Sequence, residues 1–144
     1  MIDIIDPRNH LHIAALAIGT AEGLAPFVRH RLPMLLPRGQ TEECGTIADV
    51  LEQGDIFEQP TIASLREFVA MLDDVIDGTI VERRDWAPVR CLDGYEDWQE
   101  VIIRGRTERG DAIAAIATEL QLVIELTTHT VALRRACGLL KRIQ

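Results

Sequence analysis

Apolar residues recur at helical spacing through most of the chain, and the strongest pattern lies in residues 107–144. One stripe contains Ile113, Ile116, Leu120, Ile124, Thr127 and Val131, and a second contains Leu122, Leu126, His129, Leu133, Ala136 and Leu140. Residues three and four positions apart share one face of a helix. A helix at the edge of a small domain normally carries a single apolar face. We therefore predict one long C-terminal helix that lies centrally in its domain or between subunits.

Shorter helices are predicted upstream from their start and stop residues. Asp6 before Pro7 is typical of a helix start, and this first helix should end near Gly19 or Gly23. Residues 24–32 should form a second short helix or extend the first through a kink. The segment that follows contains Pro33, Pro37 and Gly39 and is expected to be a turn-rich connection.

Two further helices are predicted in the middle of the chain. Thr46 should cap a short helix that runs to about Gln53. Pro60 and the apolar repeat that follows it predict a second helix, for which Gly78 would supply a left-handed stop.

The pattern changes between residues 79 and 106. Ile80 and Val81 on one side and Val89, Cys91 and Leu92 on the other flank residues 82–88, which predicts a small β-hairpin or an irregular loop near 79–92. A turn is expected at 93–94, followed by another helix at 95–103. Gly105 would either separate that helix from the last one or lie inside a single helix. The expected fold is all-α: one domain, residues 1–144, built as a bundle of about five helices.

Length and composition agree with one globular domain, since 47% of the 144 residues are hydrophobic. No apolar run approaches the roughly 20 residues that span a bilayer, and the first residues lack the basic and apolar regions of an export signal. The three cysteines form no close pair of the kind used in zinc or redox sites, so we expect reduced thiols. These features predict a cytoplasmic protein without a membrane partner.

Charge is distributed unevenly along the chain. The net charge is −8, but residues 42–100 hold sixteen acidic and four basic residues, whereas the remainder holds seven acidic and eleven basic residues. This distribution argues against nucleic acid as the main partner, because phosphate binding needs a concentrated basic face. It favours association between complementary protein surfaces. One alternative is an acidic inhibitor or immunity-type protein that binds a basic partner through residues 42–100; the other is that these acids form ordinary solvated helix faces.

Asp73, Asp74 and Asp77 form the best candidate metal site. Carboxylates at positions i, i+1 and i+4 of a helix can converge on Mg²⁺ bridged to a diphosphate. Over five residues, 73–77, this pattern resembles the aspartate-rich motif of prenyl-diphosphate synthases and terpene cyclases. The resemblance implies a small Mg²⁺-dependent enzyme acting on a phosphorylated or diphosphate substrate. The competing interpretation places the three aspartates on the solvated face of a helix whose other side is core.

Other catalytic patterns are weaker. The acidic pairs Asp93/Glu96, Asp97/Glu100 and Glu108/Asp111 have the spacing used by all-α nucleotide pyrophosphatases, which also bind Mg²⁺ between helices. Glu125 and His129 are four residues apart, but two ligands do not make a metal site. Neither a nucleophile elbow nor a phosphate-binding loop occurs, so catalysis is unsupported and the question of an enzyme stays open.

Residues 29–38 combine positive charge with leucines and two prolines, which is typical of a docking segment. In this interpretation Met34, Leu35 and Leu36 provide apolar contacts, while Arg29, Arg31 and Arg38 set orientation. In the long helix, the predicted contact residues are Leu126, Leu133 and Leu140. We therefore predict a non-enzymatic helical interaction or assembly subunit without a cofactor, one that forms a homo-oligomer or joins a larger complex. The leucines could instead cover the chain's own core.

Overall fold

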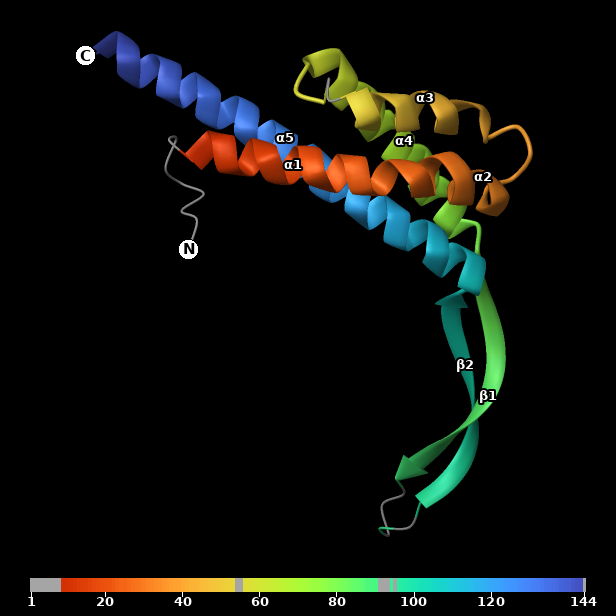
Figure 1. Ribbon diagram of the computed structural model, residues 1–144. Helices are drawn as coiled ribbons and strands as arrows, with labels where there is room; N and C mark the ends of the chain where they lie inside the picture. The colour runs from red at the N-terminus through yellow and green to blue at the C-terminus, as the bar shows by residue number, and fades with distance from the viewer. Residues whose placement is uncertain (1–8, 54–55, 91–93, 95, 144) are drawn as a thin grey trace.

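A helical body and a projecting two-stranded hairpin make up the computed structural model, which describes residues 9–53, 56–90, 94 and 96–143 (Figure 1). The body contains four long helices: α1 (His10–Pro26), α3 (Glu42–Gln53), α4 (Gln59–Asp77) and α5 (Glu108–Ile143). The hairpin consists of β1 (Ile80–Arg90) and β2 (Glu96–Arg106). The expectation of an all-α fold with about five helices is therefore wrong, although the chain is mostly helical.

The long C-terminal helix is confirmed. α5 packs against α1 on one side and α4 on the other, and α1 runs antiparallel to it (Figure 1). Its first predicted stripe is buried from Ile113 to Thr127 and half-buried at Val131. The second stripe is mixed, since Leu133 is buried, Leu126 is half-buried and Leu122 is exposed. The first stripe thus belongs to the core of the body, and only part of the second is covered by this chain.

The first helix passes both predicted stops, and of the two alternatives for residues 24–32 the structure has the extension of that helix. α1 continues through a π-helical turn, η2 (Phe27–Arg31), into the short helix α2 (Leu32–Leu35). In that turn the Leu32 N–H bonds to the Phe27 carbonyl, five residues back. Prolines lie at Pro26 and Pro33, where a regular helix would lose its backbone bonds, and the π turn lets the chain continue past them. The predicted stops at Gly19 and Gly23 are wrong, and the predicted start at residues 6–7 lies outside the described residues.

The helices α3 and α4 complete the body, and their packed side chains meet those of α1 and α5. α3 begins four residues before the predicted cap at Thr46 and places Ile47 and Leu51 in the core. α4 begins beside Pro60, as predicted, but Gly78 ends it in a right-handed conformation, with φ −68°. The fully buried core includes Leu32, Leu51, Leu65, Phe68, Leu72, Ile113 and Leu120.

The two-stranded hairpin is the largest difference between the predicted and the observed fold. A helix was expected at 95–103, but residues 96–106 form a strand that pairs antiparallel with residues 80–90. Ile80 lies opposite Arg106, and Arg90 lies opposite Glu96. Of the small hairpin predicted near 79–92, residues 80–90 form one strand of a larger hairpin, and residues 91–92 lie outside the described residues. Gly94 has φ +86°, which suits the predicted turn, although Asp93 lies outside the described residues.

One described segment, His10–Leu35, is long and apolar enough to cross a membrane when judged by length and composition, with a mean hydropathy of 1.5. This finding differs from the expectation that no apolar run approaches that length. In the structure Ala17, Ala21, Leu24 and Val28 of the segment are buried in the core, and a core helix passes the same test. The cytoplasmic location stays a prediction.

Candidate functional site

The hairpin, which we call the arm, projects from the body, and its described residues join the body at its base (Figure 1). There the Thr79 hydroxyl donates to the Ile76 carbonyl at 2.7 Å, and the Thr107 N–H donates to the Thr79 carbonyl at 3.2 Å. The Thr107 hydroxyl accepts from the Gly110 N–H at 3.1 Å and so caps the start of α5. Gly110 is buried against Thr79, where a Cβ atom would overlap the threonine side chain. These close contacts fix the position of the arm's base relative to α4 and α5.

Side chains of the arm divide between two faces according to the strand register. Even-numbered residues of both strands share one face, because residues opposite each other in this register have the same parity. That face carries Ile80, Trp86, Pro88, Trp98 and Ile102, which we call the tryptophan face. Trp98 lies opposite Pro88, and Trp86 lies diagonally across from Trp98.

The tryptophan face is open to solvent. Trp86 is 63% exposed, Trp98 62% and Ile102 63%. Two ion pairs on the same face, Arg84–Glu100 at 3.6 Å and Arg104–Glu82 at 3.2 Å, link the strands beside these side chains. Exposed cross-strand ion pairs contribute little to stability. The large apolar side chains of this hairpin therefore stay mostly exposed in the single chain.

Both edges of the arm resist the addition of another strand. The Trp86 N–H donates to the Asp85 carboxylate at 2.8 Å, and the Trp98 N–H donates to the Asp97 carboxylate at 2.9 Å. These N–H groups thus point away from the partner strand and are already satisfied. Pro88, two residues beyond Trp86 on the same edge, has no N–H to offer. Such edges disfavour strand pairing, which leaves the faces of the arm as its contact surfaces.

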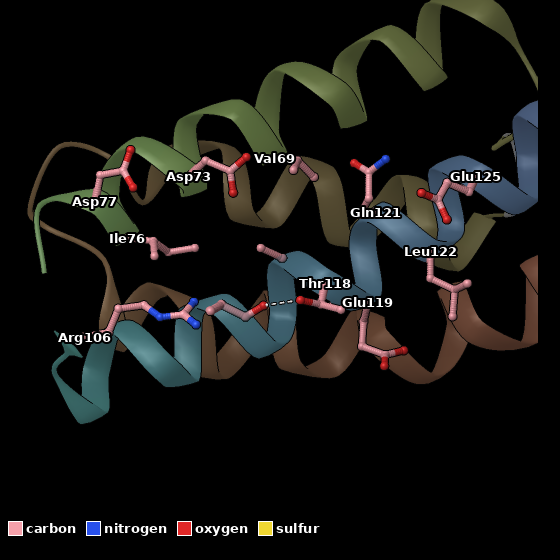
Figure 2. A pocket seen from close by; sticks show the side chains of 12 residues that line it. Val69, Asp73, Ile76, Asp77, Arg106, Thr118, Glu119, Gln121, Leu122 and Glu125 are labelled. Carbon is pink, nitrogen blue, oxygen red and sulfur yellow. Dashed lines mark hydrogen bonds between the residues drawn. The ribbon is translucent and has the colours of Figure 1, made fainter. Parts of the chain in front are cut away.

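A groove of about 870 Å³ lies between α4 and α5. Its floor includes the buried side chains of Val69 and Ile76, and its rim carries Asp73 and Asp77 from α4 and Glu125 from α5 (Figure 2). We call this feature the acidic groove. Arg106 closes one end and pairs with Asp111 at 3.4 Å. The three rim carboxylates make no ion pair with any other described residue.

The predicted metal ligands are divided between two places. Asp73 and Asp77 line the acidic groove, whereas Asp74 lines a separate hollow beside Arg109. Within the described part of the chain, no group of three or more His, Cys, Asp or Glu residues is arranged to hold a metal ion. The Mg²⁺-dependent enzyme stays a prediction. Asp97 and Glu100 lie on a strand, so this pair does not have the helical placement that the pyrophosphatase pattern requires.

The predicted docking segment, residues 29–38, is only partly exposed. Arg29 binds Asp49 at 2.6 Å and Glu52 at 3.0 Å, both on α3, and the hydrogen bond to Asp49 raises the pKa of Arg29. Leu36 is buried and Leu35 is half-buried against the core, whereas Met34 is 79% exposed. Arg31 and Arg38 are exposed. Met34 is thus the one apolar contact residue of this segment that remains fully available.

The predicted contact residues on α5 also serve this chain's own fold. Leu133 is 6% exposed, and Leu126 is half-buried against the core. The side chain of Leu140 lies outside the described residues. Close to these positions, the Arg134 guanidinium lies 4.8 Å from the centre of the Phe57 ring. The structure therefore brings Leu126 and Leu133 to the body rather than leaving them open.

Sequence reasoning missed the tryptophan face. Trp98 lies in the segment 95–103, for which the pattern predicts a helix, and Trp86 lies in the segment 79–92, for which it predicts a small hairpin or an irregular loop. A usable signal was present, because the dipeptide Asp-Trp occurs at 85–86 and again at 97–98, on either side of the predicted turn. No family model, curated protein or solved structure shows significant similarity to the chain.

Proposed function

We propose that this protein is a helical assembly subunit that contacts neighbouring copies of itself through the tryptophan face of its arm. The proposal starts from geometry, since comparison with other proteins supplies no relative. The observation that carries it is the exposure of Trp86 and Trp98 on a hairpin whose described residues meet the body at its base. Tryptophan is among the residues most enriched at the energetic centres of protein interfaces.

The energetics of the hairpin support this role. A two-stranded hairpin without a third strand or a covering helix is at best marginally stable in water. Here both strands contain eleven residues, and the described side chains are exposed or half-buried along their whole length. Burial of one face against a neighbouring copy would supply the apolar contact that the arm lacks.

The arrangement also favours contact through a face over strand exchange along an edge. Asp85, Asp97 and Pro88 block edge positions on both strands. The indoles, by contrast, present large rigid surfaces with one polar N–H each, which is the chemistry that interfaces use most effectively. A neighbouring subunit would therefore cover the tryptophan face and leave the strand edges in water.

The test is the self-association of a Trp86→Ala, Trp98→Ala double variant, measured by sedimentation and light scattering against the chain mass of 16.1 kDa. We expect the unaltered protein to associate and the variant to associate at least about tenfold more weakly. The matched control is Leu11→Ala, Leu16→Ala, which removes two exposed apolar side chains from α1 and should associate normally. A monomeric parent protein, or a tryptophan variant with unchanged association, would overturn the proposal.

A further inference from the structure

We propose that the acidic groove between α4 and α5 receives the basic C-terminal turns of α5, residues 131–143, from a second copy of this chain. The inference adds a second contact to the proposed assembly role and names its occupant. It concerns a surface separate from the tryptophan face and does not require that face.

The groove has the composition of a site for a basic amphipathic helix. Its floor is apolar, with Val69 and Ile76, and its rim carries the unpaired carboxylates of Asp73, Asp77 and Glu125 (Figure 2). An apolar floor with a charged rim is how grooves bind amphipathic helices. The acidic rim selects a helix whose polar side is positive.

The C-terminal part of α5 matches these requirements. Residues 131–143 contain four basic residues and no acidic residue. Arg134 is engaged with Phe57, whereas Arg135 is exposed. The sequence adds two further basic residues, Lys141 and Arg142, in the last turn of α5. Apolar residues recur at helical spacing in the same segment, at Ala132, Ala136, Leu139, Leu140 and Ile143.

Dimensions and connectivity identify the occupant as a second copy. On α5 the groove runs from Ala114 to Glu125, about 16 Å at 1.5 Å per residue, and residues 131–143 form a helix of about 20 Å. The segment cannot enter the groove of its own chain, because α5 continues without a break from Glu108 to Ile143. Because α5 lines the groove and also carries the tail, two copies related by a two-fold axis would each place a tail in the groove of the other.

Charge reversal tests the pairing in the full-length protein. The first variant, Asp73→Lys with Asp77→Lys, makes the groove basic, and the second, Lys141→Glu with Arg142→Glu, makes the tail acidic. Each variant alone should associate at least about tenfold more weakly than the parent protein, since like charges then face each other in both contacts. An equimolar mixture should regain parental association, because each groove then meets a tail of opposite charge.

The control variant is Glu67→Lys with Asp74→Lys, which reverses the same number of charges on α4 outside the acidic groove. It should associate like the parent protein. Association is measured by sedimentation at low and at high salt for the parent protein, the groove variant, the tail variant, their mixture and the control variant. The groove contact should weaken as the salt concentration rises. Unchanged association of both reversed variants, or a mixture no tighter than its components, would overturn the inference. A monomeric parent protein would overturn both proposals. In an associating parent, an effect of the charge variants without an effect of Trp86→Ala, Trp98→Ala, or the reverse, decides between them.

Discussion

The helical body and the arm use similar apolar residues in opposite environments. In the body Phe68 is 1% exposed and Leu120 is fully buried, whereas Trp86 and Trp98 of the arm are more than half exposed. A helix with one apolar stripe can bury it against the next helix of the same chain. A lone hairpin with apolar side chains on both faces has no such neighbour. The body is therefore stabilised from within, and we expect the arm to be stabilised by another molecule.

The largest difference should appear when one aromatic side chain is removed from each region. Phe68→Ala should lower the free energy of unfolding by about 3–5 kcal/mol, because it leaves a cavity in the core. Trp98→Ala should change it by no more than about 0.5 kcal/mol when the chain is dilute and dissociated. Urea denaturation followed by circular dichroism measures both. An equal loss of unfolding free energy in the two variants would mean that Trp98 is buried against its own chain, which would contradict the difference between body and arm.

The junction of body and arm should be sensitive to an added methyl group. Gly110→Ala places a Cβ atom against Thr79 and should cost about 1–3 kcal/mol in the same denaturation assay. Gly23→Ala is the matched helical control, because its Cβ would meet no atom within 4 Å. That substitution should be neutral or stabilise the chain by up to about 1 kcal/mol. A harmless Gly110→Ala would show that the base of the arm is loosely packed.

A smaller effect should appear at high pH in the body. Burial raises the pKa of the Cys44 thiol above its ordinary value of 9.0. A raised pKa means that the unfolded chain loses this proton first, so stability is retained below pH 9 and falls as pH rises beyond it. Compared with Cys44→Ala, the parent protein should therefore lose more stability between pH 8 and about 10. Parallel pH profiles would indicate that the Cys44 thiol is accessible to water when folded.

The helices of the body were largely predictable because their apolar residues repeat over several turns. α4 and α5 follow this rule, with Leu65, Leu72, Ile113 and Leu120 all in the core. The arm was not predictable in the same way. Its strands pair residues as far apart as Ile80 and Arg106. A short apolar run such as residues 101–103 is compatible with either a helix or a strand, so the sequence pattern alone does not distinguish them. Tertiary pairing decided the outcome there.

The candidate surfaces show the same limit. Positions such as Asp73 and Asp77 were singled out by spacing, and both line one groove. Spacing could not reveal that Asp74 turns to a different hollow, nor that Arg29 is held by Asp49 and Glu52 on α3. Which exposed residue remains free depends on neighbours distant in sequence.

The packing of α1 against α5 has a consequence for biosynthesis. The first described helix depends on the last one for its cover, and the segment His10–Leu35 has a mean hydropathy of 1.5. Synthesis proceeds from the N-terminus, so this apolar segment leaves the ribosome long before α5 exists. Until α5 emerges, the nascent chain would display an uncovered apolar helix, a natural substrate for chaperones that hold unfinished polypeptides.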